Sequence, residues 1–246
     1  MYRFYVEDSQ IGDEIVTIEG SDVNHIKNVL RMRIDEELIL CNGKGKDYHC
    51  AIENMSSDTV EARINQVVET DTELPAKIYL FQGLPKKDKM ELIIQKAVEL
   101  GVYQIIPVMM KRTVVKLDDR KKEQKKLERW QSIATSAAKQ SGRGIIPEVC
   151  PVATYKEAIL KAKELDYNVL PYENAKGMED TKRIIREAVG TKSIGIFIGP
   201  EGGFEDEEVT LAIESGVKPV TLGKRILRTE TAGLTMLSVF MFELEE

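Results

Sequence analysis

The sequence is poor in the residues that build cross-linked or metal-bound proteins. Its 246 residues include three cysteines, two histidines and one tryptophan. Cys41, Cys50 and Cys150 show no CxxC spacing and no histidine at the spacing of a metal ligand, so neither a disulfide framework nor a metal site is expected. This cysteine usage fits a reducing cytoplasm.

Long apolar runs and an excess of positive charge are also lacking. No stretch approaches the length needed to span a bilayer, and the opening residues MYRFYVEDSQ lack the continuous apolar segment of a signal peptide. We therefore expect a soluble, unprocessed protein with no membrane partner. The formal net charge is −6, which argues against a protein that coats nucleic acid through bulk electrostatics.

The charge is nevertheless unevenly distributed along the chain. Residues 111–129 hold nine Lys or Arg against four acidic residues, whereas residues 1–74 hold seven against sixteen. The basic run fits a solvated helix face as well as it fits RNA contact. Arg112, close to the end of an expected strand, is the better candidate for contact with RNA.

Residues 1–74 alternate apolar and polar side chains as short strands do. A helix is expected over 21–31, with Ser21 or Asp22 as its N-cap. Together these elements predict a small β-barrel domain, and the polar, acidic segment 69–75 predicts the linker that follows it. The expected strands cover 3–6, 14–18, 37–41, 48–52 and 60–67.

From residue 75 to residue 246, strand-like and helix-like segments alternate, which predicts a second domain with a parallel sheet. Ligands bind such sheets in the turns at the carboxyl ends of the strands. The expected strands cover 78–84, 104–110, 148–152, 168–172, 193–198 and 219–222, and the expected helices 90–100, 119–140, 155–165, 179–188, 206–215 and 232–244. The candidate ligand turns are 83–89, 172–175, 199–203 and 223–228.

Two of these turns are rich in glycine or charge. The first, IGPEGGF at 198–204, follows an apolar strand and precedes an acidic helix. The second, LGKRILRTETA at 222–232, holds three basic residues and an acid just before an apolar helix. Glycine turns at helix starts present bare backbone to a ligand. One such turn is an ordinary connection between elements, but two in succession favour a functional site.

These two turns resemble the C-terminal signatures of the RsmE-like RNA methyltransferases, SPOUT-class enzymes that methylate N3 of a uridine in small-subunit (16S) ribosomal RNA. Segments 83–114 and 136–149 resemble further signatures of that family. The resemblance implies a SPOUT-type α/β domain with a C-terminal trefoil knot at 75–246. It also implies a PUA-like RNA-binding β-barrel at 1–74, and a homodimer that works in the cytoplasm on the small ribosomal subunit.

The resemblance further implies a site for S-adenosylmethionine, built from the turns after three strands and needing no metal. Pro200, Leu222, Ile226 and Leu227 would form its apolar walls. A side chain added at Gly202 is expected to occupy the space where the cofactor meets the backbone. The expected cofactor-binding residues are Leu170, Tyr172, Glu173, Ile198, Gly199, Pro200, Gly202, Gly203, Leu222, Gly223, Ile226, Leu227, Thr231 and Ala232.

Catalysis at a uridine N3 sets a chemical requirement. Because N3 carries a proton at neutral pH, the site needs a base or a group that stabilises the uracil anion. Arg228 is expected to stabilise negative charge on a uracil oxygen, and Glu230 either to orient that arginine or to accept the proton. Glu201 and Glu230 can equally be structural, bonded to backbone at their own turns.

Contact with RNA is expected from both domains. In the first, SDVNHIKNVLRMR at 21–33 resembles the segment of the PUA-like domain that is thought to hold RNA. For His25 a surface or capping role fits as well, and for Arg143 so does a helix end that complements the dipole. The expected RNA-binding residues are Arg3, His25, Lys27, Arg31, Lys86, Lys87, Arg112 and Arg143.

The last expected helix is apolar on nearly every face, which fits either a buried core helix or an interface. We expect it to expose Leu234, Leu237, Phe240, Met241 and Leu244 to a second copy. Other functions also stay open. The chain can be a non-catalytic RNA-binding or ribosome-assembly protein of this fold, or a methyltransferase of another RNA position. An enzyme of a phosphate ligand fits less well, because carboxylates crowd the first turn.

Overall fold

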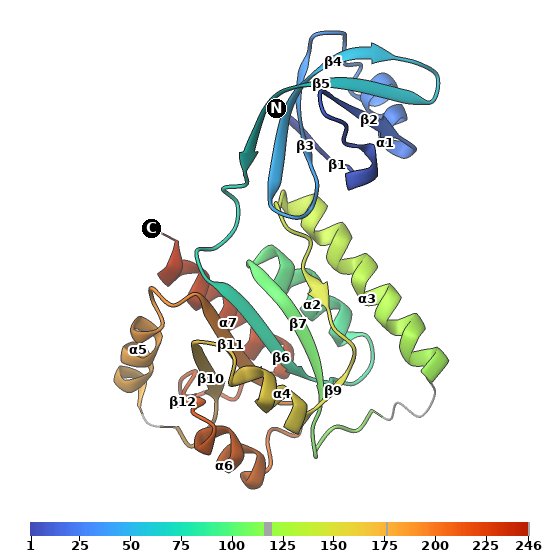
Figure 1. Ribbon diagram of the computed structural model, residues 1–246. Coiled ribbons are helices and arrows are strands. Elements are labelled where there is room, and N and C mark those ends of the chain that lie inside the picture. Colours follow the sequence, from blue (N-terminus) through green and yellow to red (C-terminus); the bar gives the residue numbers. More distant parts are fainter. Residues whose placement is uncertain (116–119, 176, 246) are drawn as a thin grey trace. The chain divides into compact units, whose positions relative to one another are not determined.

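The computed structural model describes residues 1–115, 120–175 and 177–245 (Figure 1). The chain forms two compact units. The first comprises Met1–Glu73 together with Ala138–Ile146, and the second comprises Leu74–Ala137 together with Pro147–Glu246. The first unit thus takes up a short segment from the middle of the chain.

The first unit is a five-stranded sheet with a single parallel pair, β1–β3. Its strand order is β1-β3-β4-β5-β2, and within the described residues no ladder joins β1 to β2, so the sheet stays open at that point. All five expected strands are confirmed. They are β1 (Tyr2–Tyr5), β2 (Ile15–Glu19), β3 (Glu37–Cys41), β4 (Lys46–Met55) and β5 (Thr59–Glu69).

A short helical segment closes the core of this unit. It consists of α1 (Ser21–Asn24) and the π-helical η2 (His25–Val29), and it buries Val23 and Ile26 against the sheet. The helix ends before residue 31, where it was expected to end, because Arg31 has a φ of 55° in the left-handed region.

Segment 138–146 is held to the first unit by polar contacts. The guanidinium of Arg143 pairs with Glu73, and its Nε lies 2.9 Å from Oε1 of that carboxylate. The N–H of Gly144 donates to the same oxygen at 2.9 Å, and the hydroxyl of Tyr5 donates to the carbonyl of Ala138 at 3.1 Å. Burial raises the pKa of Tyr5, which therefore stays a neutral donor.

The second unit contains a seven-stranded sheet in which every described pair is parallel, as the sequence predicts. Its order is β12-β10-β11-β6-β7-β8, with β9 beside β7. The strand expected over 148–152 ends at Val149, before Pro151, which has no N–H to donate to a ladder, and a further short strand follows at Ala153–Thr154. The strands are β6 (Lys77–Gly83), β7 (Val102–Met109), β8 (Glu148–Val149), β9 (Ala153–Thr154), β10 (Tyr167–Pro171), β11 (Ser193–Ile198) and β12 (Lys218–Val220).

All six expected helices of residues 75–246 are present. The third begins at Arg120 among the described residues, and residue 119, where its start was expected, lies outside them. The last helix begins at Thr229 rather than at residue 232. The helices are α2 (Lys89–Glu99), α3 (Arg120–Ser141), α4 (Tyr155–Ala162), α5 (Met178–Glu187), α6 (Asp206–Glu214) and α7 (Thr229–Leu244).

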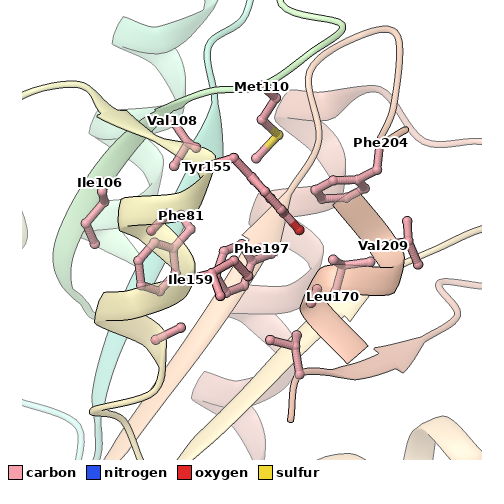
Figure 2. Packing of buried hydrophobic residues seen from close by; sticks show 14 residues of the cluster. Phe81, Ile106, Val108, Met110, Tyr155, Ile159, Leu170, Phe197, Phe204 and Val209 are labelled. Atoms are coloured by element: carbon pink, nitrogen blue, oxygen red, sulfur yellow. The ribbon is translucent and has the colours of Figure 1, made fainter. Parts of the chain in front are cut away.

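Helices cover both faces of this sheet. On one face, α4 and α6 pack over the stacked rings of Phe81 and Phe197, whose centroids lie 4.4 Å apart (Figure 2). On the other face, which lies behind the sheet in Figure 1, α7 packs on β6 and β11. A side chain at Gly233 of α7 would begin 3.6 Å from Ile198. Burial on both faces explains why these strands are almost continuously apolar.

The division of α7 into buried and exposed side chains corrects the expectation for the last helix. Leu237, Phe240 and Leu244 are buried within the second unit and face its own sheet. Leu234 and Met241 are half-buried, and the large apolar side chain that α7 does expose is Phe242, at 78%. None of the described helices combines the length and the apolar character that crossing a bilayer requires.

Candidate active site

A two-lobed cavity lies where three strands of the second unit end. The larger lobe encloses about 520 Å³ and the smaller about 260 Å³. Their walls come from the turns after β10, β11 and β12, which the parallel sheet brings to one edge. Both lobes are lined by Pro171, Tyr172, Glu173, Ile226, Leu227 and Ala232.

Twelve of the fourteen expected cofactor-binding residues line this cavity. Leu170 does not, because its side chain lies in the core with Phe197 (Figure 2). Thr231 does not either, since it is exposed on the first turn of α7. The larger lobe holds Ile198, Gly199, Pro200, Gly202 and Gly203, the smaller holds Leu222 and Gly223, and both hold Tyr172, Glu173, Ile226, Leu227 and Ala232.

The glycine turn after β11 is packed tightly from behind. A Cβ at Gly83, the last residue of β6, would lie 2.6 Å from the backbone nitrogen of Pro200. A Cβ at Gly202 would lie 2.9 Å from the Cβ of Arg112. A side chain at Gly202 would thus meet Arg112, and the expectation that it would also occupy the space of the cofactor stays a prediction.

Arg112 braces this turn from the end of β7. Its Nε donates to Glu205 at 2.9 Å and its NH1 donates to the carbonyl of Gly202 at 2.8 Å. The hydrogen bond and charge of Glu205 raise the pKa of Arg112, and the same pair lowers the pKa of Glu205. The structure thus shows Arg112 as a support of the cavity wall, a role that the sequence did not indicate.

A buried polar bridge joins the three elements behind the cavity. The hydroxyl of Thr229 donates to the carbonyl of Gly199 at 2.6 Å and accepts from Nε2 of Gln82 at 2.9 Å. Both side chains are buried. Neither residue was expected to have a role, although a glutamine within the apolar strand IYLFQGL is a signal of a buried polar contact.

Lys89 was expected only as a member of the candidate turn 83–89, with no role of its own. It begins α2 and lines the larger lobe. Its Nζ lies 3.2 Å from Oε1 of Glu201 and 3.2 Å from Oε2 of Glu230. The carboxylate of Glu201, followed by that of Glu230, raises the pKa of Lys89. The basic sequence after Gly83 was the available signal.

Glu201 is held as an anion. Burial alone would raise its pKa, but the backbone N–H of Lys86, which donates at 3.0 Å, and the ammonium of Lys89 outweigh burial and lower it. Glu201 therefore combines both expected possibilities, because it is bonded to backbone and also lines the cavity.

The two expected catalytic residues lie together but are only loosely paired. NH1 of Arg228 lies 4.0 Å from Oε1 of Glu230, and the arginine side chain is 80% exposed at the cavity wall. Glu230 is nearer to Lys89 than to Arg228, and its own side chain is only 15% exposed. The main contact of Glu230 is therefore with Lys89 and not with Arg228, which it was expected to orient.

The expected RNA-binding residues fall into two groups. The structure corrects the expectation for Arg143. Its side chain is only 5% exposed and pairs with Glu73, so it is not available to RNA. Arg3 is mostly buried and pairs with Asp47 at 2.6 Å. The others reach solvent at least in part. They are His25, Lys27, Arg31, Lys86, Lys87 and Arg112.

The site contains no evident metal ligands. Within residues 1–115, 120–175 and 177–245, no three His, Cys, Asp or Glu side chains gather closely enough to hold a metal ion.

The fold and the cavity together define an RNA methyltransferase domain. The family described as RNA methyltransferase domain matches residues 72–241, and the family described as RNA methyltransferase PUA domain matches residues 18–65. A ribosomal RNA small subunit methyltransferase E from Bacillus subtilis is 38% identical over 251 aligned residues, covering 100% of this chain and 98% of the relative.

Solved structures agree with this match. The ribosomal RNA small subunit methyltransferase E of Neisseria gonorrhoeae, bound to S-adenosyl methionine, is 36% identical with a TM-score of 0.80, over 98% of this chain and 97% of that one. A methyltransferase from Legionella pneumophila in complex with the same cofactor is 35% identical with a TM-score of 0.78, over 98% and 96%. The chain belongs to the ribosomal RNA small subunit methyltransferase E family.

Proposed function

We propose that this protein transfers the methyl group of S-adenosylmethionine to N3 of a uridine in 16S ribosomal RNA. The observation that carries the proposal is the two-lobed cavity at the ends of β10, β11 and β12, walled by glycine turns. Two family members of similar fold are bound to S-adenosylmethionine, which supports the choice of ligand.

The residues present fit this cofactor. The larger lobe has the size usual for small-molecule sites. Ile226 is 91% exposed at their rim, so the adenosine of the cofactor would cover an apolar side chain that otherwise faces water. The walls carry charges of both signs: Glu173 and Glu201 suit a sulfonium cation, while Lys89, Arg112 and Arg228 also line the larger lobe.

The bound cofactor supplies an electrophilic methyl group, and the protein supplies position and charge. The backbone of Gly199, Gly202 and Gly223 provides hydrogen-bonding groups close to the ligand. Arg228 stabilises negative charge on a uracil oxygen as N3 loses its proton. Removing that charge from water makes each such contact stronger than it would be at the surface.

RNA contact is assigned to the exposed cations of both units. In the PUA-like domain at 1–74 these include Lys27 and Arg31, and in the SPOUT-type domain at 75–246 they include Lys86 and Lys87. Contacts of this kind with phosphates fix the orientation of RNA without reading its sequence. The same proposal includes a cytoplasmic protein that meets its substrate in the small ribosomal subunit.

The trefoil knot and the homodimer also belong to this proposal. The chain leaves β11, pairs β12 on the far side of β10, and returns to start α7 at Thr229 against Gly199, a path that suits a threaded C-terminus. The half-buried Leu234 and Met241 and the exposed Phe242 leave α7 an apolar face for a second copy.

Calorimetry and methyl transfer test the function together. We expect the protein to bind S-adenosylmethionine and to transfer labelled methyl to small-subunit RNA that lacks the modification. Absence of binding to the cofactor and to its demethylated product would contradict the methyltransferase and leave a non-catalytic RNA-binding protein.

A further inference from the structure

The wall of the larger lobe contains a fixed cation, Lys89. Neither the proposed cofactor contacts nor the proposed role of Arg228 explains its position. Lys89 opens α2, directly after the turn that follows β6, and its side chain extends between two other elements. Glu201 belongs to the turn after β11 and Glu230 to the first turn of α7. One ammonium thus joins the ends of three segments that are far apart in sequence.

The ammonium of Lys89 has more donors than charged partners. It carries three N–H groups, and the carboxylates of Glu201 and Glu230 each lie 3.2 Å away as ion-pair partners. No third partner is seen among the described residues, and Lys89 lines the cavity. The two carboxylates also keep the lysine charged, because they raise its pKa.

Glu230 is better placed to hold Lys89 than to accept a proton from a substrate. It is not among the residues that line the larger lobe. Its Oε2 is buried and, although it is ion-paired with Lys89, forms no well-aligned hydrogen bond with any described residue. A carboxylate that is turned toward a lysine in this way fixes the position of the lysine.

We propose that Lys89 is a catalytic residue that binds an oxygen of the target uracil together with Arg228, and that Glu201 and Glu230 are its positioning residues. This inference rests on the proposed function. Lys89 and Arg228 both line the larger lobe, so two cations from different segments border the same space. Fixed charges aimed at a developing anion are among the largest contributions to catalysis.

The chemistry balances without a further reactant. The N3–H bond of the uracil breaks and its proton passes to water, while the negative charge spreads to the carbonyl oxygens O2 and O4. The electron pair on N3 then forms a bond to the methyl carbon, and the pair of the broken C–S bond stays on sulfur. Lys89 and Arg228 keep their protons throughout and only stabilise the charge on oxygen.

The test compares Lys89→Met and Lys89→Arg with Lys96→Met in the full-length protein. Lys96 lies on the same helix and pairs with Glu99 at 2.9 Å, so its replacement also removes an ion pair from α2 without touching the cavity. Single-turnover methylation of unmodified small-subunit RNA should be about 100-fold slower in Lys89→Met. It should be partly restored in Lys89→Arg and unchanged in Lys96→Met.

Binding and pH dependence separate catalysis from structure. Affinity for S-adenosylmethionine and its demethylated product should stay within about twofold of the parent in Lys89→Met, or roughly 0.4 kcal/mol. The charged groups that line the larger lobe are Lys89, Arg112, Glu173, Glu201 and Arg228, and Glu230 pairs with Lys89. Loss of the Lys89 charge makes N3 harder to deprotonate, so the rise of rate with pH should extend to higher pH in Lys89→Met.

Three results of these experiments would overturn the role of Lys89 or the proposed function. A Lys89→Met variant that matches the parent in rate and in pH profile overturns the role of Lys89 alone. A variant whose rate falls only in proportion to its cofactor affinity also overturns it, because Lys89 then acts through the cofactor site. A parent that transfers no methyl to RNA overturns the proposed function, and this inference with it.

Discussion

At the scale of single residues, the cavity depends on close contacts behind its wall. Gly83 allows the end of β6 to touch Pro200, and Thr229 connects Gly199 to Gln82. Such contacts could be predicted only in part. The glycine turns are visible in the sequence. The contact of Gln82 with Thr229 and those of Lys89 with Glu201 and Glu230 each join residues more than a hundred positions apart, and no local pattern indicates them.

Loss of the Thr229 hydroxyl should loosen the turn after β11. In Thr229→Val the buried carbonyl of Gly199 loses its donor and Gln82 loses an acceptor. We expect the free energy of unfolding to fall by about 1–3 kcal/mol. Affinity for S-adenosylmethionine should also fall. Thr229→Ser keeps the hydroxyl and is the control, and equal stability of the valine variant in urea unfolding would contradict the bridge.

A side chain at Gly83 should be poorly tolerated. The Cβ of Gly83→Ala would begin 2.6 Å from the backbone of Pro200, which cannot move away as a flexible side chain would. Overpacking of this kind costs about 1–3 kcal/mol, and it should also displace the cofactor turn. Gly177→Ala meets nothing within 4 Å and serves as the control. Parent-like calorimetry and thermal unfolding of Gly83→Ala would contradict this contact.

At the scale of elements, most strands and helices could be predicted from the sequence. Apolar side chains recur with a different period in strands than in helices, and turns separate the elements. It could not predict which face of α7 is buried, since that helix is apolar all round. Leu237 and Phe240 face the sheet and Phe242 faces solvent, and only packing decides between them. The division of the strand at Pro151 was visible in the sequence, because proline cannot donate to a ladder.

An ion-pair cluster ties the end of α5 to the starts of β10 and β12. Lys218, then Tyr167 and Arg183, lower the pKa of Glu187 from 4.5 to about 2. The cluster therefore stabilises the fold above pH 4.5, and this stability is lost as the pH falls from about 4.5 to about 2.

The neutral variant Glu187→Gln should show a weaker pH dependence. Urea unfolding between pH 5 and pH 2.5 should reveal a steeper loss of stability in the parent than in Glu187→Gln. Glu214→Gln, which removes a carboxylate that makes no ion pair among the described residues, should follow the parent. Parallel curves for all three proteins would show that Glu187 does not depend on Lys218.

At the scale of the whole molecule, the chain is two units rather than two consecutive segments. Residues 138–146 join the first unit through Arg143 and Glu73, although the first four of them form the end of α3, which begins in the second. The sequence offered no sign of this, because a basic residue at a helix end has an equally good local explanation.

The dimer proposed here depends on the outer face of α7. Phe242→Lys places a charge on that face and should yield monomers in sedimentation, while secondary structure is retained. Val189→Lys changes a residue that is 47% exposed at the end of α5 and is the control. A parent that is monomeric and fully active would contradict the dimer. A dimeric Phe242→Lys variant would contradict only the assignment of its interface.

The central claim is that the cavity at the ends of β10, β11 and β12 methylates N3 of a uridine in 16S ribosomal RNA. It is tested most directly by transfer of labelled methyl from S-adenosylmethionine to unmodified small-subunit RNA, followed by digestion to nucleosides and separation of the products. We predict that the label appears in 3-methyluridine. Label in any other nucleoside, or RNA without label, would contradict the claim.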